Sequence, residues 1–360
     1  MKKTLLCLFG GRSTEYEVSL MSVCSVLRAL DTEKYDTLML GITREGTWYL
    51  YNGTLEAIAD DTWHTDRAHL RRAMLSPSPA DGGCLYAEVP DCGTELHSFA
   101  AYKIDVVFPV MHGAFCEDGT LQGLLSMAGI PYVGPHCAAS AVSMDKAFTK
   151  MILSNYPVDQ ARYTVITRTA LMRDPDAAIA AAEAVDAYPL FVKPANAGSS
   201  VGVSKARSKE ELLRALRCAA EYDDKILVEE CIVGREVECA VLGNEDAQTA
   251  VPGEIDPGSD FYDYDTKYVN ATSADHIPAR ISDGALARVR AQAKLIYEAL
   301  GCRGLSRVDF FVTAEERIVF NEINTLPGFT SISMYPKLWN HMGKSTTALI
   351  DALIEYAMQA

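Results

Sequence analysis

The sequence of 360 residues lacks several features that mark other classes of protein. It contains no uninterrupted apolar run of about 18 residues, so a membrane-spanning helix is not expected. Ten cysteines are present, but no two of them form a C-x-x-C pair. The apolar run after the initial MKK is too short for a signal peptide and ends in glycines. We therefore expect a cytoplasmic protein whose thiols are reduced.

Positive charge is also scarce. The chain has 33 lysines and arginines against 48 aspartates and glutamates, which gives a net charge of −15. Such a chain is a poor match for a nucleic acid or an anionic membrane, and we expect neither as a partner. It can still bind a phosphate-bearing ligand where a few local cations and a metal ion gather. The length exceeds that of one ordinary core and predicts two or three domains.

The first third of the chain has the pattern of an α/β fold. Apolar segments typical of buried strands lie at residues 4–9, 36–43 and 105–113. Between the first two, apolar residues recur with the spacing of a helix. This order predicts a doubly wound parallel sheet, in which ligands bind beyond the carboxyl ends of the strands. Glu15 and His112 both lie at such ends, whereas residues 50–102 show no clear pattern.

The rest of the chain mixes helices and strands in an α+β pattern. A turn-rich segment at 130–140 is expected to separate the first domain from a helix over 138–155. Strands are expected at 190–194, 201–206, 225–231, 236–243, 306–312 and 317–324. A polar loop at 255–276 and a helix near 284–300 lie between the fourth and fifth of these strands. We therefore expect three domains, over residues 1–134, 135–230 and 231–360.

Two glycine-containing loops could receive a ligand. Residues 10–19 read GGRSTEYEVS, which is not G-x-G-x-x-G, and the carboxylate of Glu15 would repel a phosphate at the helix start. Residues 193–202 read KPANAGSSVG, which lacks the G-K-[ST] of a Walker loop and precedes a strand. The backbone N–H groups of Gly198, Ser199 and Ser200 could close over phosphates. The alternative for this second loop is a plain β-turn that uses glycine for its backbone freedom.

Four polar side chains lie on the two strands near the C-terminal end. Arg307 and Asp309 are two residues apart and share a face, as do Glu322 and Asn324 on the next strand. Folding the two strands as a hairpin places Asp309 opposite Glu322, and Arg307 opposite Asn324. Carboxylate and amide oxygens of this kind suit Mg²⁺. The alternative is a surface salt-bridge cluster, which the mostly apolar character of both strands disfavours.

Two further polar segments have an open interpretation. Residues 261–268 read FYDYDTKY, which suggests either a lid or a solvated loop with aromatic anchors. Residues 112–123 read HGAFCEDGTLQG and follow a buried strand. There Asp118 could simply cap a helix, and His112 could be a histidine satisfied within a turn. Neither segment identifies a ligand by itself.

Taken together, these segments resemble the D-alanine–D-alanine ligase family of the ATP-grasp superfamily. The matching segments are GGRSTEYEVSL, VFPVMHGAFCEDGTLQG, SMDK, FVKPANAGSSVGVSK, VEECIVGREVE, FYDYDTKY, GLSRVDFF and FNEINTLPGFTSISMYP. They follow the family order and span residues 4 to about 336. The resemblance implies a three-domain ATP-grasp fold, with ATP between the sheets of the last two domains, and a homodimer.

The resemblance also implies the reaction. ATP phosphorylates the carboxylate of a first D-alanine, and the amine of a second D-alanine attacks the acyl phosphate. Phosphate leaves, and D-alanyl-D-alanine is made for peptidoglycan precursors. A carboxylate that attacks a phosphoryl group needs charge neutralisation rather than a nucleophilic side chain, and this chain supplies lysines, an arginine and a metal site. An acyl phosphate hydrolyses in water, so the 255–276 loop is expected to close as a lid.

Site residues follow from the resemblance position by position. Those implied at the first D-alanine are Glu15, Ser199 and Tyr268 around its ammonium, with His112 and Glu117 lining the pocket. Those implied at the second D-alanine and the oxyanion are Ser333, Met334, Arg307 and the Gly328 backbone. Those implied at ATP are Lys146, Lys193, Ser200 and Lys267 near the phosphates, Glu229 and Glu230 near the adenine, and Glu236 at the ribose. Asp309, Glu322 and Asn324 are implied to hold two Mg²⁺ or Mn²⁺ ions.

A few positions depart from the common family pattern. Tyr16 stands where most relatives carry histidine, and STEYEVSL looks like the vancomycin-resistance ligases that make D-alanyl-D-serine. Cys116 replaces a glycine, so the loop before Glu117 could be shaped differently. Met334 stands where those resistance ligases tend to have arginine, and Tyr268 argues against the D-lactate type. We expect D-alanine as the second substrate and keep D-serine as the alternative, since a few side chains decide between them.

Interpretations from other classes fit less well. A different ATP-grasp ligase would not be expected to match at both 10–19 and 327–336. A non-catalytic nucleotide-binding protein would be expected to have lost a metal or lysine position, and none is lost. The sequence therefore predicts an enzyme.

Overall fold

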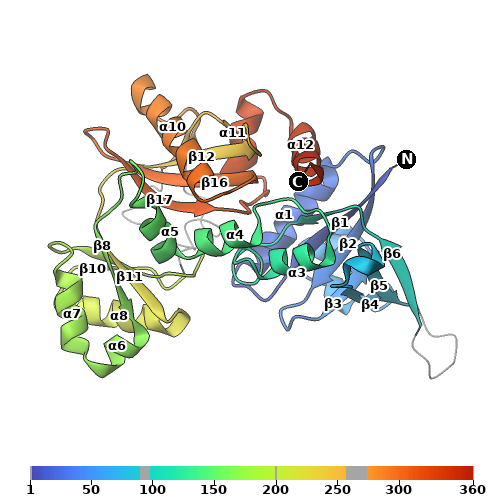
Figure 1. Cartoon of the computed structure of the whole chain (residues 1–360), viewed down its shortest axis with the longest axis horizontal. Helices are drawn as coiled ribbons and strands as arrows, with labels where there is room; N and C mark the ends of the chain where they lie inside the picture. The colour runs from blue at the N-terminus through green and yellow to red at the C-terminus, as the bar shows by residue number, and fades with distance from the viewer. Residues whose placement is uncertain (1, 90–97, 199–200, 257–273, 360) are drawn as a thin grey trace.

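The computed structural model describes residues 2–89, 98–198, 201–256 and 274–359. The strands of these residues form three sheets, which we call the N-terminal, central and C-terminal sheets (Figure 1). Within these ranges no helix combines the length and the apolar character needed to cross a membrane. The domain boundaries at 134 and 230 stay a prediction.

The N-terminal sheet is parallel at one end and antiparallel over the rest. β1 (Lys3–Gly10) lies between β2 (Tyr35–Ile42) and β7 (Val106–Pro109) and is parallel to both. From β2 the sheet continues through β3 (Trp48–Tyr51), β4 (Leu70–Leu75), β5 (Cys84–Glu88) and β6 (Phe99–Lys103), each antiparallel to the one before. The predicted parallel arrangement therefore covers three strands. The short connection after β2 can join only antiparallel neighbours.

Helices cover both faces of β1. Alternate residues of this strand are buried in two different apolar clusters, with Leu5 and Phe9 in one and Leu6 and Leu8 in the other. The first cluster includes α1 (Tyr16–Ala29), and the second includes α3 (Thr120–Ala128). This burial on both sides explains the continuous apolar run of the strand. The short helix α2 (Leu55–Ala59) packs against α1.

Two helices precede the central sheet where a single one was predicted over 138–155. They are α4 (Cys137–Met144) and α5 (Lys146–Leu153). The chain is extended at Asp145, with ψ 98°, and the carboxylate of Asp145 accepts hydrogen bonds from the N–H groups of Ala147 and Phe148. The prediction of one helix was wrong because this capping carboxylate begins a second helix in a new direction.

The central sheet is antiparallel and has its own core. Its strands are β8 (Tyr163–Thr167), β9 (Leu190–Pro194), β10 (Ser204–Ala206) and β11 (Lys225–Glu230), in the order β10-β9-β11-β8. The helices α6 (Arg168–Arg173), α7 (Pro175–Glu183) and α8 (Lys209–Tyr222) pack against them. Ser208 caps α8 by accepting the N–H of Glu211.

The C-terminal sheet carries the predicted polar hairpin. Its strands are β12 (Arg235–Gly243), β13 (Gln248–Thr249), β14 (Gly253–Asp256), β15 (Ala274–His276), β16 (Gly304–Val312) and β17 (Ile318–Asn324). β16 and β17 are antiparallel neighbours, and their register pairs Arg307 with Asn324 and Asp309 with Glu322. The predicted pairing is therefore confirmed. The helices that the structure describes in this part are α10 (Asp283–Ala299), α11 (Met334–His341) and α12 (Thr346–Met358).

The N-terminal and C-terminal parts share one apolar core. The cluster that holds Phe9 and Val23 also holds Phe329, Tyr335 and Leu353. Figure 1 shows α12, at the red end of the chain, beside α1 of the blue N-terminal part. The central sheet lies to one side with a separate core. The segment between β17 and α11 consequently runs along the boundary between the first and last parts of the chain.

Candidate active site

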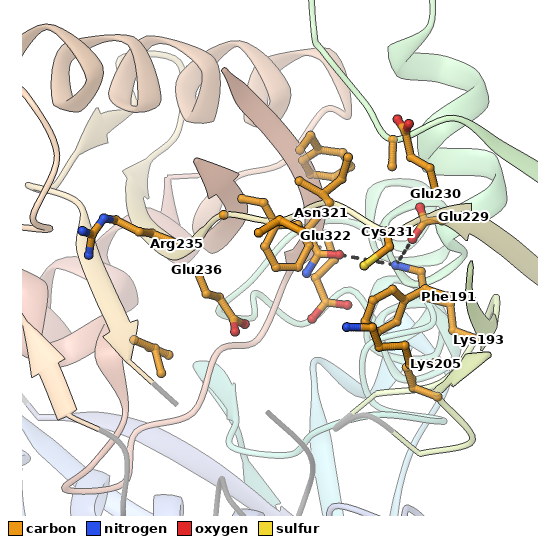
Figure 2. A pocket seen from close by; sticks show the side chains of 18 of the residues that line it. Phe191, Lys193, Lys205, Glu229, Glu230, Cys231, Arg235, Glu236, Asn321 and Glu322 are labelled. Carbon is orange, nitrogen blue, oxygen red and sulfur yellow. Dashed lines mark hydrogen bonds and ion pairs between the residues drawn. The ribbon is translucent and has the colours of Figure 1, made fainter. Parts of the chain in front are cut away.

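A cavity of about 610 Å³ lies between the central and C-terminal sheets. Its apolar wall residues include Phe191, Val203, Ile232, Phe311 and Phe320. Its charged wall residues include Lys146, Lys193, Lys205, Glu229, Glu230, Glu236 and Glu322. Figure 2 shows the ends of Lys193, Lys205 and Glu322 directed into the same space. A cavity with aromatic and aliphatic walls and several lysines fits a ligand that has an apolar ring system and an anionic portion.

A buried carboxylate on β11 is paired with two lysines. Glu229 Oε1 lies 2.6 Å from Lys150 Nζ, and Glu229 Oε2 lies 2.5 Å from Lys193 Nζ. Burial alone would raise the pKa of Glu229, but the two ammonium groups outweigh it and hold that pKa at about 2. Burial also lowers the pKa of Lys150. Glu229 therefore stays ionised and holds Lys193 at the cavity wall.

Lys146 and Glu322 connect this cavity to a second, smaller one. The Nζ of Lys146 lies 3.2 Å from Glu322 Oε2 and donates to the carbonyl of Ala197 at 2.8 Å. Both side chains also line the smaller cavity, together with Glu15 and Glu117. The two cavities thus meet at a lysine and a carboxylate. A group transferred from a ligand in one cavity to a ligand in the other would pass these two side chains.

The hairpin of β16 and β17 brings its polar groups into contact. Arg307 donates to both carboxylate oxygens of Asp309, at 2.8 and 2.7 Å, and lies 2.9 Å from Glu238. Burial would lower the pKa of Arg307, but these carboxylates raise it well above its usual value, so the guanidinium keeps its charge. Asn324 Nδ2 donates to Asp309 Oδ2 at 2.9 Å. The amide oxygen of Asn324, Oδ1, is then the atom of that side chain able to bind a metal.

The donor set of this hairpin fits a hard divalent cation. Asp309 and Glu322 supply carboxylate oxygens, and Asn324 supplies an amide oxygen. Within the described residues, no three or more His, Cys, Asp or Glu side chains form a group that could hold a metal ion. Such an ion would therefore depend on the amide oxygen and on oxygens of a bound ligand. This is the coordination that Mg²⁺ prefers, with few protein oxygens and additional phosphate or water ligands.

The opening glycine pair places Glu15 in the smaller cavity. Gly10 and Gly11 have φ of 83° and 108°, and a Cβ at Gly10 would lie 2.2 Å from the carbonyl oxygen of Ile42. The chain turns there and begins α1 directly after Glu15. A Cβ added to Gly113 or to Gly198 would lie 2.5 Å from Glu15 Oε2. Three loops from distant parts of the sequence therefore converge on this carboxylate.

Glu117 and His112 hold the segment after β17. Glu117 accepts the N–H of Gly113 at 2.9 Å and the N–H of Leu326 at 3.0 Å. Burial, followed by the nearby charge of Glu15, raises the pKa of Glu117 to about 7. His112 Nδ1 lies 2.9 Å from the carbonyl oxygen of Leu326, and burial lowers its pKa. Glu117 lines the smaller cavity, whereas His112 is not among the described residues that line either cavity.

The remaining predicted residues are distributed around these cavities. Glu230 and Glu236 line the large cavity, and Glu230 accepts two hydrogen bonds from Arg162. A Cβ at Gly328 would lie 2.8 Å from Ser333 Oγ, so these two residues are adjacent. The side chain of Met334 is buried in the shared core, close to Gly253. Ser199, Ser200, Lys267 and Tyr268 lie outside the described residues.

Tyr16 is turned away from the site. Its ring is 1 % exposed and packs in the N-terminal core, where its hydroxyl donates to Asp61 at 2.9 Å and accepts from Trp63 Nε1 at 3.0 Å. The guanidinium carbon of Arg44 lies 4.0 Å from the ring centroid. The other departure, Cys116, is fully buried, and its carbonyl accepts a hydrogen bond from Gln122. Both departures are accommodated by packing outside the cavities.

Sequence reasoning missed several residues that line the large cavity or, like Lys150, lie behind its wall. Lys150 follows Lys146 by one helical turn, and that spacing was the available signal that the two share a face. Lys205 lies on a predicted strand, but its direction depends on the pairing of β10 with β9. Phe311 and Phe320 have the pattern of ordinary core residues. No local signal distinguishes an aromatic that lines a cavity from one that fills a core.

The fold and site together define a class of protein. A central and a C-terminal sheet enclose a cavity lined by lysines and by Glu322 of the carboxylate–amide hairpin. This is the arrangement of an ATP-grasp ligase.

Comparison with known proteins identifies the family. Family models described as "D-ala D-ala ligase N-terminus" and "D-ala D-ala ligase C-terminus" match residues 4–135 and 152–355. The D-alanine--D-alanine ligase of Acetivibrio thermocellus is 47 % identical, over 99 % of this chain and 96 % of its own length. That of Clostridium acetobutylicum is 45 % identical, over 99 % and 98 %. The chain belongs to the D-alanine–D-alanine ligase family.

Solved structures agree with this assignment. The VanG D-Ala:D-Ser ligase from Enterococcus faecalis is 41 % identical and superposes with a TM-score of 0.88, covering 99 % of this chain and all of that one. The D-alanine-D-alanine ligase from Coxiella burnetii is 32 % identical, with a TM-score of 0.80, over 99 % of this chain and 94 % of that one. The predicted fold class and family are confirmed.

Proposed function

We propose that this protein uses ATP to join two D-alanine molecules into D-alanyl-D-alanine, with release of ADP and phosphate, for peptidoglycan precursors. The observation that carries the proposal is the meeting of the two cavities at Lys146 and Glu322. A nucleotide in the large cavity and an amino acid beside Glu15 would face each other across these two side chains. The D-alanine--D-alanine ligases described above support the same reaction.

ATP occupies the large cavity in this proposal. Its adenine lies by β11, near Glu229 and Glu230, and its ribose binds Glu236. Its phosphates bind Lys146 and Lys193, together with Lys267 and Ser200. Glu229 supports this arrangement because it is paired with both Lys150 and Lys193. The pairing with Lys193 keeps that ammonium group at the cavity wall.

Asp309, Glu322 and Asn324 would hold Mg²⁺ or Mn²⁺, as two ions, which would supply positive charge to neutralise the phosphates. The protein's own contribution at this hairpin is to keep the ligating oxygens adjacent on paired strands. Arg307 stays charged between Asp309 and Glu238 and offers its guanidinium to the developing oxyanion.

The two D-alanines occupy different walls of the site. Glu15 binds the ammonium of the first, in a network completed by Ser199 and Tyr268, and its negative charge suits that ammonium. The loop of Gly328 and Ser333 receives the second, whose amine attacks the acyl phosphate. The backbone N–H of Gly328 stabilises the oxyanion together with Arg307. The ends of the predicted 255–276 loop belong to β14 and β15, and its central part lies outside the described residues. The lid role of that central part, which would exclude water from the reaction, belongs to this proposal.

D-Alanine is the second substrate in this proposal, and D-serine is the alternative. The D-alanine choice rests on the more similar relatives, at 47 % and 45 % identity, whereas the D-serine ligase structure is 41 % identical. The orientation of Tyr16 removes the main sequence argument for D-serine, because its ring does not line the cavities. The apolar character of Met334 is also explained by its burial in the shared core, so it does not decide between the two substrates.

Phosphate release tests the proposal. We expect release from ATP and Mg²⁺ when D-alanine alone is added, and much slower release when D-serine or D-lactate is the only added substrate. Absence of release with every D-amino acid would rule out the ligase function for this protein.

A homodimer and a cytoplasmic location complete the proposal. Sedimentation velocity tests the homodimer. The free thiols of the nine described cysteines support the cytoplasmic location.

A further inference from the structure

A buried serine of α1 links the N-terminal part of the chain to the Gly328 loop. Ser22 is fully buried, and its Oγ accepts the N–H of Phe329 at 3.2 Å. The same oxygen lies 3.2 Å from His112 Nε2. His112 Nδ1 in turn lies 2.9 Å from the carbonyl oxygen of Leu326. The chain from Leu326 to Phe329 is therefore attached at both ends to the N-terminal part.

The chemistry of the partners sets the direction of each hydrogen bond. A carbonyl oxygen can only accept, so His112 Nδ1 carries the proton and donates to Leu326. Burial lowers the pKa of His112, which keeps the ring neutral and makes Nε2 an acceptor. The hydroxyl of Ser22 then donates to Nε2, while its lone pair accepts from Phe329. Each polar atom of the relay has a partner of the correct kind.

The relay lies directly behind the residues of the proposed oxyanion and acceptor sites. Gly328 stands between the two attached ends, and a Cβ on it would lie 3.9 Å from Ser22 Oγ and 2.8 Å from Ser333 Oγ. Ser333 Oγ accepts the N–H of Thr330 at 3.0 Å, so the loop is held internally as well. Without the relay, this internal bond would persist while the loop lost its attachment to α1.

We propose that Ser22 is a positioning residue that, through His112 and Phe329, keeps the Gly328 N–H and Ser333 aligned on the second D-alanine. The proposal rests on the proposed function of Gly328 and Ser333. Ser22 itself contacts no substrate in this account. His112 acts in the relay through its backbone partner at Leu326. The hydrogen bonds and ion pairs described for Lys146, Lys193 and Glu229 join them to Ala197, Glu322, Lys150 and Asn321 rather than to Ser22 or His112, so we expect the ATP contacts to be independent of Ser22.

Steady-state kinetics of Ser22→Ala test the positioning role. We expect kcat to fall about tenfold and the KM of the second D-alanine to rise about tenfold, with the KM of ATP within twofold of wild type. Two serines of the same helix are controls. Ser19→Ala removes an equally buried hydroxyl whose partners, Gly10 and Val110, lie within the N-terminal part. Ser25→Ala removes an exposed hydroxyl that donates to the carbonyl of Met21 in the same helix.

The expected pattern is selective. Ser25→Ala should leave all constants unchanged, and Ser19→Ala should lower thermal stability without the selective rise in the second KM. Ser22→Thr, which restores the hydroxyl, should recover part of the loss. The proposal is overturned if Ser22→Ala has wild-type constants, or if Ser19→Ala and Ser22→Ala change all of them alike.

A second measurement does not depend on catalysis. Nitrogen NMR of ¹⁵N-histidine-labelled full-length protein, with His112→Gln to assign the signal, reports which ring nitrogen carries the proton. We expect His112 in the neutral Nδ1–H form, with an Nε2 signal that shifts in Ser22→Ala. An Nε2–H form, or an unchanged signal in Ser22→Ala, would overturn the relay even if wild-type protein makes the dipeptide. Conversely, if the protein makes no dipeptide but the His112 nitrogen signals are as expected, the proposed function is contradicted and the hydrogen-bonded relay is confirmed.

Discussion

Single side chains decide what this site can do, and Glu322 is the clearest example. It lines both cavities, contacts Lys146 at 3.2 Å and lies opposite Asp309 on the neighbouring strand. Its position could be predicted because alternation along β17 and the short turn before it determine the hairpin register. The contact with Lys146 could not be predicted, since it joins residues 176 positions apart through the packing of α4 and α5 against the C-terminal part.

Replacing Glu322 tests the metal site. Glu322→Gln keeps the shape of the side chain but removes the charge, and we expect kcat to fall by about 10²- to 10³-fold. The far-ultraviolet circular dichroism spectrum should be unchanged. Glu315→Gln, in the exposed turn of the same hairpin, is the matched control and should keep wild-type phosphate release. Wild-type turnover in Glu322→Gln would remove this residue from the metal site.

Tyr16 shows how a residue next to a functional one can serve packing instead. Its hydroxyl is the acceptor for the indole N–H of Trp63, which is fully buried. Tyr16→Phe should therefore destabilise the fold by about 1–3 kcal/mol, measured by denaturant unfolding. The ratio of D-alanyl-D-alanine to D-alanyl-D-serine formed from an equal mixture should stay within twofold of wild type. A tenfold change in that ratio would mean that the ring acts on acceptor choice.

At the level of elements, three segments meet around one buried carboxylate. α5 supplies Lys150, β9 supplies Lys193, and β11 supplies Glu229 between them. Propensity and periodicity predicted all three elements, although the helix was predicted as part of a longer one. The triad itself was not predicted, because it depends on how α5 packs against β11. The antiparallel strands β3 to β6 escaped prediction for a related reason, since their pairing rests on neighbours distant in the sequence.

The triad makes a prediction for acid stability. The folded-state pKa of Glu229, about 2, lies below its ordinary value of 4.5, so its ionised form stabilises the fold above about pH 4.5. That contribution is lost as the pH falls from about 4.5 toward 2. Glu229→Gln should therefore be less stable than wild type at pH 7, and the difference in unfolding free energy should shrink across this window. A difference independent of pH between 2 and 6 would contradict the pairing.

At the scale of the whole molecule, the N-terminal and C-terminal parts share a core, whereas the central sheet has its own. The large cavity lies between the central and C-terminal sheets, so a ligand there bridges two separately packed units. Binding that bridges two units should stabilise the folded molecule. The sequence predicts three domains and most of their helices and strands. It does not predict that the N-terminal and C-terminal parts share one apolar core, because that depends on contacts between residues far apart in the chain.

Thermal unfolding tests that bridging. MgATP at about 100 times its Kd should stabilise the folded protein by about 2.7 kcal/mol and raise the Tm accordingly. Lys193→Met should lose most of that rise, because it removes a cation from the cavity wall. Chelation of the metal with EDTA should reduce the rise in wild-type protein. A Tm that is insensitive to MgATP would place the nucleotide elsewhere.

The most direct test of the central claim is the identity of the product. Mass spectrometry should be applied to a reaction of wild-type protein with ATP, Mg²⁺ and equal concentrations of D-alanine and D-serine. We predict that D-alanyl-D-alanine dominates and forms in proportion to the phosphate released. A reaction that yields no dipeptide, or mainly D-alanyl-D-serine, would contradict the account.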